Sequence, residues 1–256
     1  KTCMLSQAEQ SILSGKVVLV TGALGGIGSE VALAYARHGA TIILLDKNIA
    51  QLEKLYDVIV QESGIEPAIF PVDFKGATAD DYQQLAQTIK ATFGRLDGLV
   101  HCAADVGQLA PIANQDIKQW AETLQVNLTA AFLLTHACLP LLQTTEQQSF
   151  IIFTTDSQHD KAYRGAYGLS KAAIECFCHQ LALEMEAAAK VRVNCIEPGQ
   201  VKTKLHARVY PAADPQHLPE PSAVIPAYLY LASDQSGHLH GQCVNAQMEL
   251  PVKVLA

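Results

Sequence analysis

The chain has 256 residues, of which 49% are hydrophobic and 17% are charged. This length and composition fit one large globular domain or two small ones, with enough chain to bury a core. The net charge of -7 argues against a nucleic-acid-binding surface, which needs a basic face. No apolar run approaches the roughly 20 residues of a membrane helix, and residues 1–10 lack the apolar core of a secretory signal.

The cysteines and histidines predict no metal site. The chain has 7 cysteines, an odd number without regular spacing, which is typical of reduced thiols in a cytoplasmic protein. Cys176 and Cys178 lie two apart on an expected helix and would point in different directions, so we expect buried small side chains rather than zinc ligands. His238 and His240 stand beside Gly241 near a late turn, where we expect exposure to solvent.

Short apolar, β-branched runs alternate along the chain with longer segments of helical periodicity. The runs predict strands at residues 16–21, 41–46, 67–72, 96–102, 149–155, 191–196 and 241–246. The longer segments predict helices at residues 29–38, 49–63, 80–93, 117–142, 167–189 and 221–232. Asn48 is a candidate cap for the second helix, and Gly64 is expected to end it.

This alternation predicts an α/β fold with a doubly wound parallel sheet of the Rossmann type, with about seven strands and helices on both faces. We therefore expect one NAD(P)-binding domain over residues 1–256. Ligands of such sheets bind at the carboxyl ends of the strands. Residues 199–220 form the one long connection, which contains His206, Tyr210 and His217 and which we expect to be a mobile lid over the substrate.

A glycine cluster follows the first strand directly, as Thr21-Gly22-x-x-x-Gly26-x-Gly28. Gly22 allows a tight turn off the strand, and Gly26 and Gly28 let backbone and helix approach a diphosphate. The free N–H groups at the start of the next helix would hold the phosphates. A glycine cluster by itself can be a simple turn, but the strand before it and the helix after it favour a cofactor site.

Asp46 lies at the tip of the second strand, 18 residues after Gly28. A carboxylate there can accept hydrogen bonds from both ribose hydroxyls of the adenosine half of a cofactor, and it repels a 2′-phosphate. We therefore expect NAD, with NADP the weaker ligand. The alternative is a cap for the next helix, and Lys47 would partly offset the repulsion.

Tyr167 and Lys171 lie four residues apart on an expected helix, so they share a face. A phenol alone is a poor proton shuttle, because its ordinary pKa is about 10. A fixed cation nearby would lower the pKa of Tyr167 toward the working pH. Such a pair also arises by chance on ordinary surface helices, so the rest of the chain must decide.

With these motifs in this order, the chain resembles the short-chain dehydrogenase/reductase family over about residues 14–247. The resemblance implies that Tyr167 and Lys171 are the catalytic pair. It implies that Asn127 lies at an irregularity of a long helix, where a bound water links the lysine to solvent. It also implies a cofactor site made of Gly22, Leu24, Gly26, Ile27, Gly28, Asp46, Asp73, Phe74, Cys102, Ala103, Ala104, Tyr167, Lys171, Pro198, Gly199, Val201 and Thr203.

The first departure from the family follows the fourth strand. The family usually has Asn-Asn-Ala-Gly there, whereas this chain has His101-Cys102-Ala103-Ala104. Ala104 in place of glycine is expected to crowd the cofactor ribose slightly. His101 is expected to be a packed histidine rather than a catalytic one.

The second departure follows the fifth strand, where the family places a serine that holds the substrate oxygen. Here the chain reads Thr154-Thr155-Asp156-Ser157, and alignment on the strand puts Asp156 in the serine position. An ionised carboxylate accepts hydrogen bonds and donates none, so we predict that Ser157 is the donor. Asp156 is then expected to point away or to bind backbone amides, and Thr155 is the reserve candidate.

The function implied by the resemblance is hydride transfer between a nicotinamide cofactor and an alcohol or carbonyl compound, with catalytic residues Tyr167, Lys171, Asn127 and Ser157. The alternative is a cofactor-binding sensor or scaffold without turnover, which the altered serine region favours. A nucleotide-sugar epimerase would need a longer C-terminal domain. The family also implies a homodimer or homotetramer, formed through the two long helices, with Ala130, Ala131, Leu134, Ala172, Ala173 and Phe177 as candidate contacts.

Overall fold

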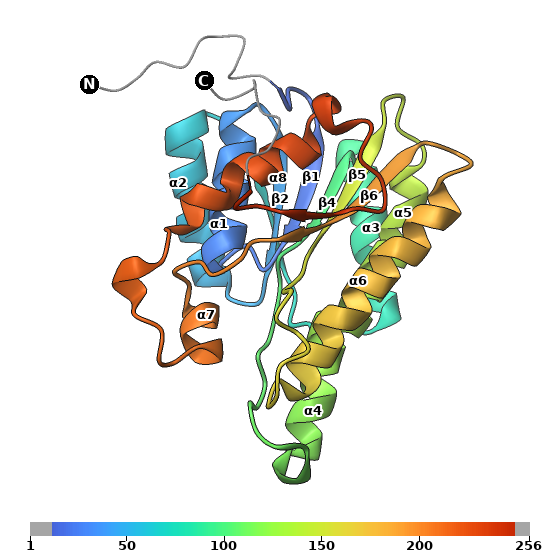
Figure 1. Ribbon diagram of the computed structural model, residues 1–256. Coiled ribbons are helices and arrows are strands. Elements are labelled where there is room, and N and C mark those ends of the chain that lie inside the picture. Colours follow the sequence, from blue (N-terminus) through green and yellow to red (C-terminus); the bar gives the residue numbers. More distant parts are fainter. Residues whose placement is uncertain (1–11, 249–256) are drawn as a thin grey trace.

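The computed structural model describes residues 12–248, which wind around one parallel sheet (Figure 1). Residues 1–10, judged above for a secretory signal, and Cys3 lie outside this range. The strands are β1 Val17–Thr21, β2 Thr41–Asp46, β3 Ala68–Pro71, β4 Gly98–His101, β5 Ser149–Thr154, β6 Val191–Glu197 and β7 Cys243–Asn245. Their order across the sheet is β3-β2-β1-β4-β5-β6-β7. The predicted doubly wound fold is confirmed.

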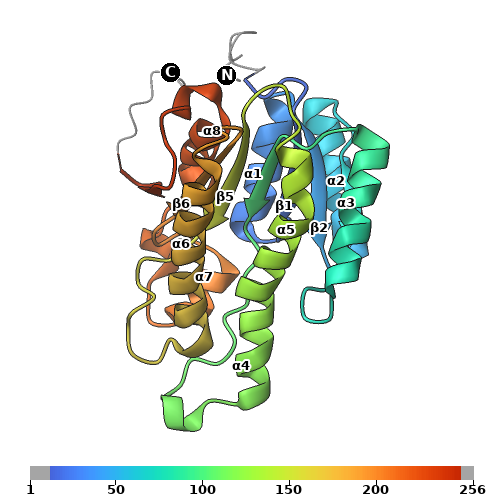
Figure 2. The same cartoon turned by 90° about the vertical axis from the view of Figure 1, so that its right-hand side faces the viewer.

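Helices cover both faces of the sheet, as Figures 1 and 2 show. One face carries α1 Gly26–Arg37, α2 Ile49–Ser63 and α8 Ile225–Ala232. The other carries α3 Ala79–Phe93, α4 Ile117–Leu124, α5 Ala130–Leu142 and α6 Gly165–Met185. The inner strands β1, β2, β4, β5 and β6 are covered on both sides and almost continuously buried, and each face of the sheet has its own hydrophobic core. The edge strands β3 and β7 are partly exposed.

The helix ends follow local chemistry. Asn48 Oδ1 accepts a hydrogen bond from Gln51 N at 3.1 Å, which caps α2 as predicted. Gly64 ends that helix with φ at +72°, a conformation that costs little without a side chain. The glycine cluster itself forms the first turn of α1, which therefore begins three residues earlier than the predicted position.

The predicted helix at residues 117–142 is continuous but contains an irregular turn. Gln125–Thr129 forms a π-helical segment (η3) between α4 and α5, and the buried Asn127 lies inside it. The helix irregularity implied by the family is therefore present. The expectation that no apolar segment approaches the length of a membrane helix is wrong for this span, which is long and apolar enough to cross a membrane by composition. In the structure, 44% of its most apolar window is buried, and it packs on α3 and α6 (Figure 2).

Several side chains expected at a subunit interface lie in the core instead. Ala130, Ala131 and Leu134 are buried on the sheet side of α5. His101 is also buried, as predicted: its ring stacks on Phe153 with centroids 4.7 Å apart, and burial lowers its pKa to about 3. The histidine is therefore neutral and has a packing role.

The connection at residues 199–220 has more regular structure than its composition indicates. It contains a short helix, α7 Lys204–Val209, and a 3₁₀ turn, η4 Pro215–His217. Thr203 caps α7, because its Oγ1 accepts from His206 N at 3.0 Å. In Figure 1, α7 and α4 project past the same end of the sheet. The remaining short turns are η2 Ile112–Asn114, η5 Pro221–Val224 and η6 Asp234–Ser236.

Candidate active site

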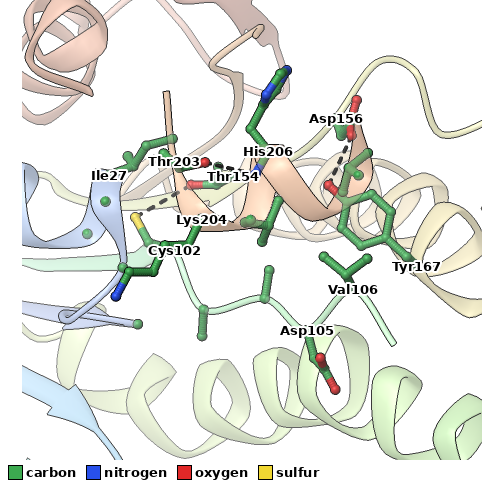
Figure 3. A pocket seen from close by; sticks show the side chains of 18 of the residues that line it. Ile27, Cys102, Asp105, Val106, Thr154, Asp156, Tyr167, Thr203, Lys204 and His206 are labelled. Atoms are coloured by element: carbon green, nitrogen blue, oxygen red, sulfur yellow. Dashed lines mark hydrogen bonds between the residues drawn. The ribbon is translucent and has the colours of Figure 1, made fainter. Parts of the chain in front are cut away.

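A cavity of about 1070 Å³ runs along the carboxyl ends of the strands. Every residue predicted to bind the cofactor lines it, from the glycine cluster to Thr203. Ser157 also lines it, together with Asp156 and the α7 residues His206 and Arg208. Figure 3 shows Cys102 and Thr154 on one side of this cavity and Tyr167 on the other. The cavity therefore joins a glycine-rich half to a half lined by side chains.

The glycine-rich half is shaped by backbone packing. Gly22 has φ at +62°, and a Cβ there would lie 2.6 Å from Ala103 Cα, so only glycine fits. Thr21 Oγ1 accepts from the backbone N–H groups of Cys102 and Ala103, each at 3.2 Å. These contacts hold the loop after β1 against the loop after β4. The first turn of α1 has no side-chain cap and no acidic residue, so its N–H groups are free for a phosphate.

Asp46 stands at the end of β2, where the sequence placed it. Its Oδ2 accepts from Leu24 N at 3.2 Å, and its Oδ1 accepts from Lys47 N at 2.8 Å. The carboxylate thus ties the tip of β2 to the glycine loop. It also lines the cavity, and its oxygens retain lone pairs that a ribose hydroxyl can use.

Tyr167 and Lys171 lie on successive turns of α6 and both face the cavity. Lys171 Nζ is 5.8 Å from the centre of the Tyr167 ring, and it donates a hydrogen bond to Thr154 O at 2.8 Å. Only 2% of Tyr167 and 5% of Lys171 is exposed. The pair is therefore held in a desolvated position at the end of β5, and the predicted shared face is confirmed.

The expected pKa of Tyr167 is wrong for the free protein. Burial raises the pKa of Tyr167 well above its ordinary value, and the negative charge of Asp156 raises it further. Burial also lowers the pKa of Lys171, against the opposing effect of Asp156. Desolvation penalises both charged forms, so helix spacing alone could not show which effect is larger.

Asn127 is a link between two elements rather than part of the cavity wall. Its Oδ1 accepts from Asp105 N at 2.7 Å, and its Nδ2 donates to Asp105 O at 2.8 Å and to Ser170 Oγ at 2.9 Å. The side chain thus joins the loop after β4 to α6. A second, much smaller cavity lies beside Asn127 and Lys171, between them and the sheet.

Comparisons with known proteins agree with this geometry. Residues 16–214 match the family described as short chain dehydrogenase. The chain is 40% identical over 243 residues to the uncharacterized oxidoreductase YciK of Escherichia coli K12, covering 94% of this chain and 95% of that protein. The chain belongs to the short-chain dehydrogenase family. It is an oxidoreductase of that family.

Two solved structures of family members resemble the chain closely. A short chain dehydrogenase of Escherichia coli CFT073, in complex with NADPH, has a TM-score of 0.90 and 41% identity, covering 93% of this chain and 99% of that one. A short chain dehydrogenase of Shigella flexneri 2a, in complex with NADP, has a TM-score of 0.90 and 39% identity, covering 93% and 100%.

After β5, where the chain lacks the family's serine, Asp156 lies differently from the prediction. Asp156 does not point away from the site: its Oδ2 accepts a hydrogen bond from the Tyr167 hydroxyl at 2.9 Å (Figure 3). Its other oxygen accepts from Gln158 N at 2.9 Å, so the expected contact with a backbone amide is present. This contact two residues along forms an Asx turn, which fixes the carboxylate toward the tyrosine.

Ser157 and Thr155, the two candidate hydroxyl donors, do not contact the Tyr167 hydroxyl. Ser157 is exposed at the cavity wall, and the described residues give its side chain no hydrogen bond. Thr155 is buried and turned toward α6, where its Oγ1 donates to Glu175 Oε1 at 2.7 Å. Strand alternation ends with β5 at Thr154, so it could not assign the direction of the residues that follow.

The sequence reasoning missed the side chains that hold α7 over the cavity. On one side, Arg208 Nη2 donates to Gly107 O at 3.2 Å, and Nη1 lies 3.8 Å from Asp105 Oδ1. On the other, Arg164 Nη1 donates to Val209 O at 3.3 Å. These contacts cross between distant parts of the chain, and no local pattern in the sequence indicates them.

Proposed function

We propose that this family member transfers a hydride between a nicotinamide cofactor and an alcohol or carbonyl substrate, with Tyr167 exchanging the proton. One observation carries the proposal: Tyr167 and Lys171 line the same cavity as the glycine cluster that forms the first turn of α1. The cofactor, when bound, accepts or supplies the hydride. The protein contributes binding, orientation and proton transfer.

All of the predicted catalytic residues except Ser157 have a role in this proposal, as do the residues predicted to bind the cofactor. The N–H groups of the first turn of α1 bind the diphosphate, and Asp73 and Phe74 line the adenine end. Pro198, Gly199 and Val201 line the nicotinamide end, beside Thr203. Lys171 holds the cofactor ribose, and Asn127 keeps α6 and the loop after β4 in register. The cofactor-binding roles follow from the positions of these residues on the cavity wall, and the role of Asn127 follows from its hydrogen bonds to Asp105 and Ser170.

We further propose that NAD is preferred over NADP. Asp46 supports the preference, because a carboxylate at the ribose position repels a 2′-phosphate. The complexes with NADP and NADPH described above belong to relatives, and they make this the part of the proposal that most needs a test. Calorimetric titration with both cofactors is that test, and tighter NADP binding by the unaltered protein would overturn the preference.

The Asp46→Ala variant sharpens the cofactor test. Removing the repulsive carboxylate should relax the discrimination between NAD and NADP about tenfold, through weaker NAD binding and stronger NADP binding. Asp57→Ala is a matched control, because Asp57 is an exposed carboxylate on α2 that does not line the cavity. It should leave both dissociation constants unchanged. Equal effects of the two variants would remove Asp46 from the selection of cofactor.

Turnover itself is tested on a panel of alcohols and ketones with each cofactor, following absorbance of the reduced nicotinamide. The panel should contain aliphatic and aromatic ketones, 1,2-diketones and acyclic polyols, since the cavity has both apolar and polar walls. Binding of cofactor without turnover of any of these compounds would count against catalysis and in favour of a cofactor sensor. A thermal-shift measurement with each cofactor separates failure to bind from failure to react.

Assembly into a homodimer or homotetramer is also part of the proposal. Phe132 on α5 and Leu169 on α6 are 47% and 55% exposed, and Phe132 packs edge-on against Phe177. These apolar side chains on the two long helices support an interface there. Light scattering of the purified protein measures the assembly.

A cytoplasmic location is also part of the proposal. It rests on the cysteine content, since the six described cysteines are all free thiols.

A further inference from the structure

We propose that Asp156 is a catalytic residue that receives the proton of Tyr167 when an alcohol is oxidised and returns it when a carbonyl compound is reduced. The inference rests on the proposed function, because it names the next group in the same proton path. It assigns a proton-accepting role to the position where the family ordinarily has a serine.

The Tyr167 hydroxyl has one hydrogen-bond acceptor to which it can pass its proton in the described residues. Among residues 12–248, the one hydrogen-bond partner of the Tyr167 hydroxyl is Asp156 Oδ2, at 2.9 Å. The phenol is buried, whereas Asp156 is partly exposed at the cavity wall. A proton that leaves the phenol along this bond thus passes from a desolvated position to one that water can reach.

Two polar groups close to the phenol, Lys171 and Asn127, cannot accept that proton. Lys171 as an ammonium has donors only, and it already donates to Thr154 O. The amide of Asn127 is engaged with Asp105 and Ser170 and has no basic nitrogen. A carboxylate accepts hydrogen bonds at neutral pH and binds a proton reversibly, and Asp156 is the group of this kind that contacts the phenol among the described residues. A serine in this place could donate a hydrogen bond but could not hold the proton.

The step balances without any further reactant. In oxidation, the O–H bond of the alcohol breaks and its proton goes to the oxygen of Tyr167, while the Tyr167 O–H bond breaks and that proton goes to Asp156 Oδ2. A bound nicotinamide cofactor would accept the carbon-bound hydrogen with its electron pair, and a carbonyl group would remain. Asp156 then loses its proton to water. In reduction, each transfer runs backwards, and Tyr167 is neutral at both ends of the step.

This path suits the charges around Tyr167. A free phenolate would be disfavoured by burial and by the adjacent carboxylate, and the concerted transfer avoids forming one. The Asx turn to Gln158 N holds one carboxylate oxygen and leaves the other directed at the phenol. The side chain is thereby positioned for proton transfer before substrate enters.

The first test needs no substrate and uses the cofactor-free protein. With 3-fluorotyrosine at position 167, ¹⁹F NMR follows ionisation of the phenol in the unaltered protein and in Asp156→Asn. Arg164, Tyr210 and Lys171 also act on this phenol, but they are the same in both proteins. Removing the adjacent negative charge should lower the pKa of the fluorophenol by about one unit or more. An unchanged titration would overturn the proposed contact and the proton path.

The second test uses the substrate that the panel finds. Asp156→Asn keeps the size of the side chain but cannot hold the proton, and it should lower kcat at least ~10²-fold. In Asp156→Ala, added formate should restore turnover at least about tenfold, because a small carboxylate can occupy the vacated space and accept the proton. Asp160→Asn and Asp160→Ala are matched controls, since Asp160 is an exposed carboxylate of the same loop outside the cavity wall. They should keep full activity and show no response to formate.

The outcomes separate this inference from the proposed function. Loss of activity in Asp156→Asn with rescue of Asp156→Ala by formate supports the proton path. Full activity in Asp156→Asn, or loss in Asp156→Ala that formate cannot rescue, overturns it while the hydride transfer stands. A proton inventory in mixed H₂O and D₂O adds a readout that a structural role would not change: it should be curved for the unaltered protein and linear for Asp156→Asn. Absence of turnover in the unaltered protein overturns the proposed function and the proton path with it.

Discussion

The two halves of the cavity are built in different ways. The half under β1 and β2 is shaped by backbone: Gly22 fits only because it has no Cβ, and Thr21 holds two backbone N–H groups of the next loop. The half under β5 and α7 is shaped by side chains, such as the Tyr167–Asp156 bond and the Arg208–Asp105 pair. We therefore expect the backbone-shaped half to bind the cofactor and the side chains of the second half to set the chemistry, so that one side-chain change there has the larger effect on turnover.

The largest effect on turnover is expected from removal of the Tyr167 hydroxyl, in the half of the cavity that side chains shape. Tyr167→Phe should keep the fold and cofactor binding but lower kcat by ~10²–10⁴, because the transferable proton is lost. Turnover with the panel substrate and calorimetry with the cofactor measure the two effects separately. Tyr163→Phe is the control, since Tyr163 is 63% exposed and lies outside the cavity wall. A Tyr167→Phe enzyme with full activity would remove Tyr167 from the mechanism.

A substitution at Gly28 is the most direct way to disturb the backbone-shaped half of the cavity. A Cβ there would lie 2.2 Å from Gly22 O, so the first turn of α1 must shift away from the loop. We expect Gly28→Ala to weaken cofactor binding at least about tenfold, because the N–H groups that hold the diphosphate move with that turn. Gly76→Ala is the control, since an added Cβ at Gly76 meets nothing within 4 Å. Equal dissociation constants for the two variants would contradict the assigned role of the glycine loop.

The difference between the backbone-shaped half and the side-chain-shaped half also explains which parts of the site could be predicted from the sequence. Glycine spacing, strand tips and helix periodicity are local, and they placed the sheet and the cavity-lining residues Gly22 and Asp46 correctly, while the family resemblance supplied Thr203. The direction of Asp156 depends on an Asx turn beyond the end of a strand, where periodicity has no meaning. The contacts of Arg208 depend on residues about a hundred positions away, which no local pattern encodes.

A smaller effect is expected at the contacts that hold α7. Arg208 is 60% exposed and its partner Asp105 is 20% exposed, and pairs of this kind contribute little to stability. On the expectation that α7 is part of a lid over the substrate, Arg208→Ala should raise KM about two- to fivefold with little change in kcat, because one contact that holds α7 in place is lost. Arg37→Ala removes an exposed ion pair with Glu62, outside the cavity wall, and should change neither constant. A large fall in kcat for Arg208→Ala would place Arg208 at the reacting atoms instead.

The smallest effect is expected at Ser157, which the sequence alone ranked above Asp156. Its side chain is exposed and makes no hydrogen bond with the described residues, whereas Asp156 contacts the Tyr167 hydroxyl directly. A donor to the substrate oxygen must lie within hydrogen-bond reach of the place where Tyr167 acts, and its removal would cost ~10²–10³ in kcat. We expect Ser157→Ala to change kcat by about twofold or less, because no contact of this side chain reaches the Tyr167 hydroxyl in the described residues.

The ratio of the kcat values of Ser157→Ala and Asp156→Asn decides between the two residues. If Ser157→Ala lowers kcat more than Asp156→Asn does, the serine is the missing donor and the loop after β5 must rearrange around the substrate. If Asp156→Asn has the larger effect, the carboxylate is the group that replaced the family's serine. Because both residues lie in the same turn, a general loss of loop structure would lower both activities together, and thermal melting of each variant detects it. The ratio of the two kcat values therefore reports chemistry at the Tyr167 hydroxyl rather than stability of the loop.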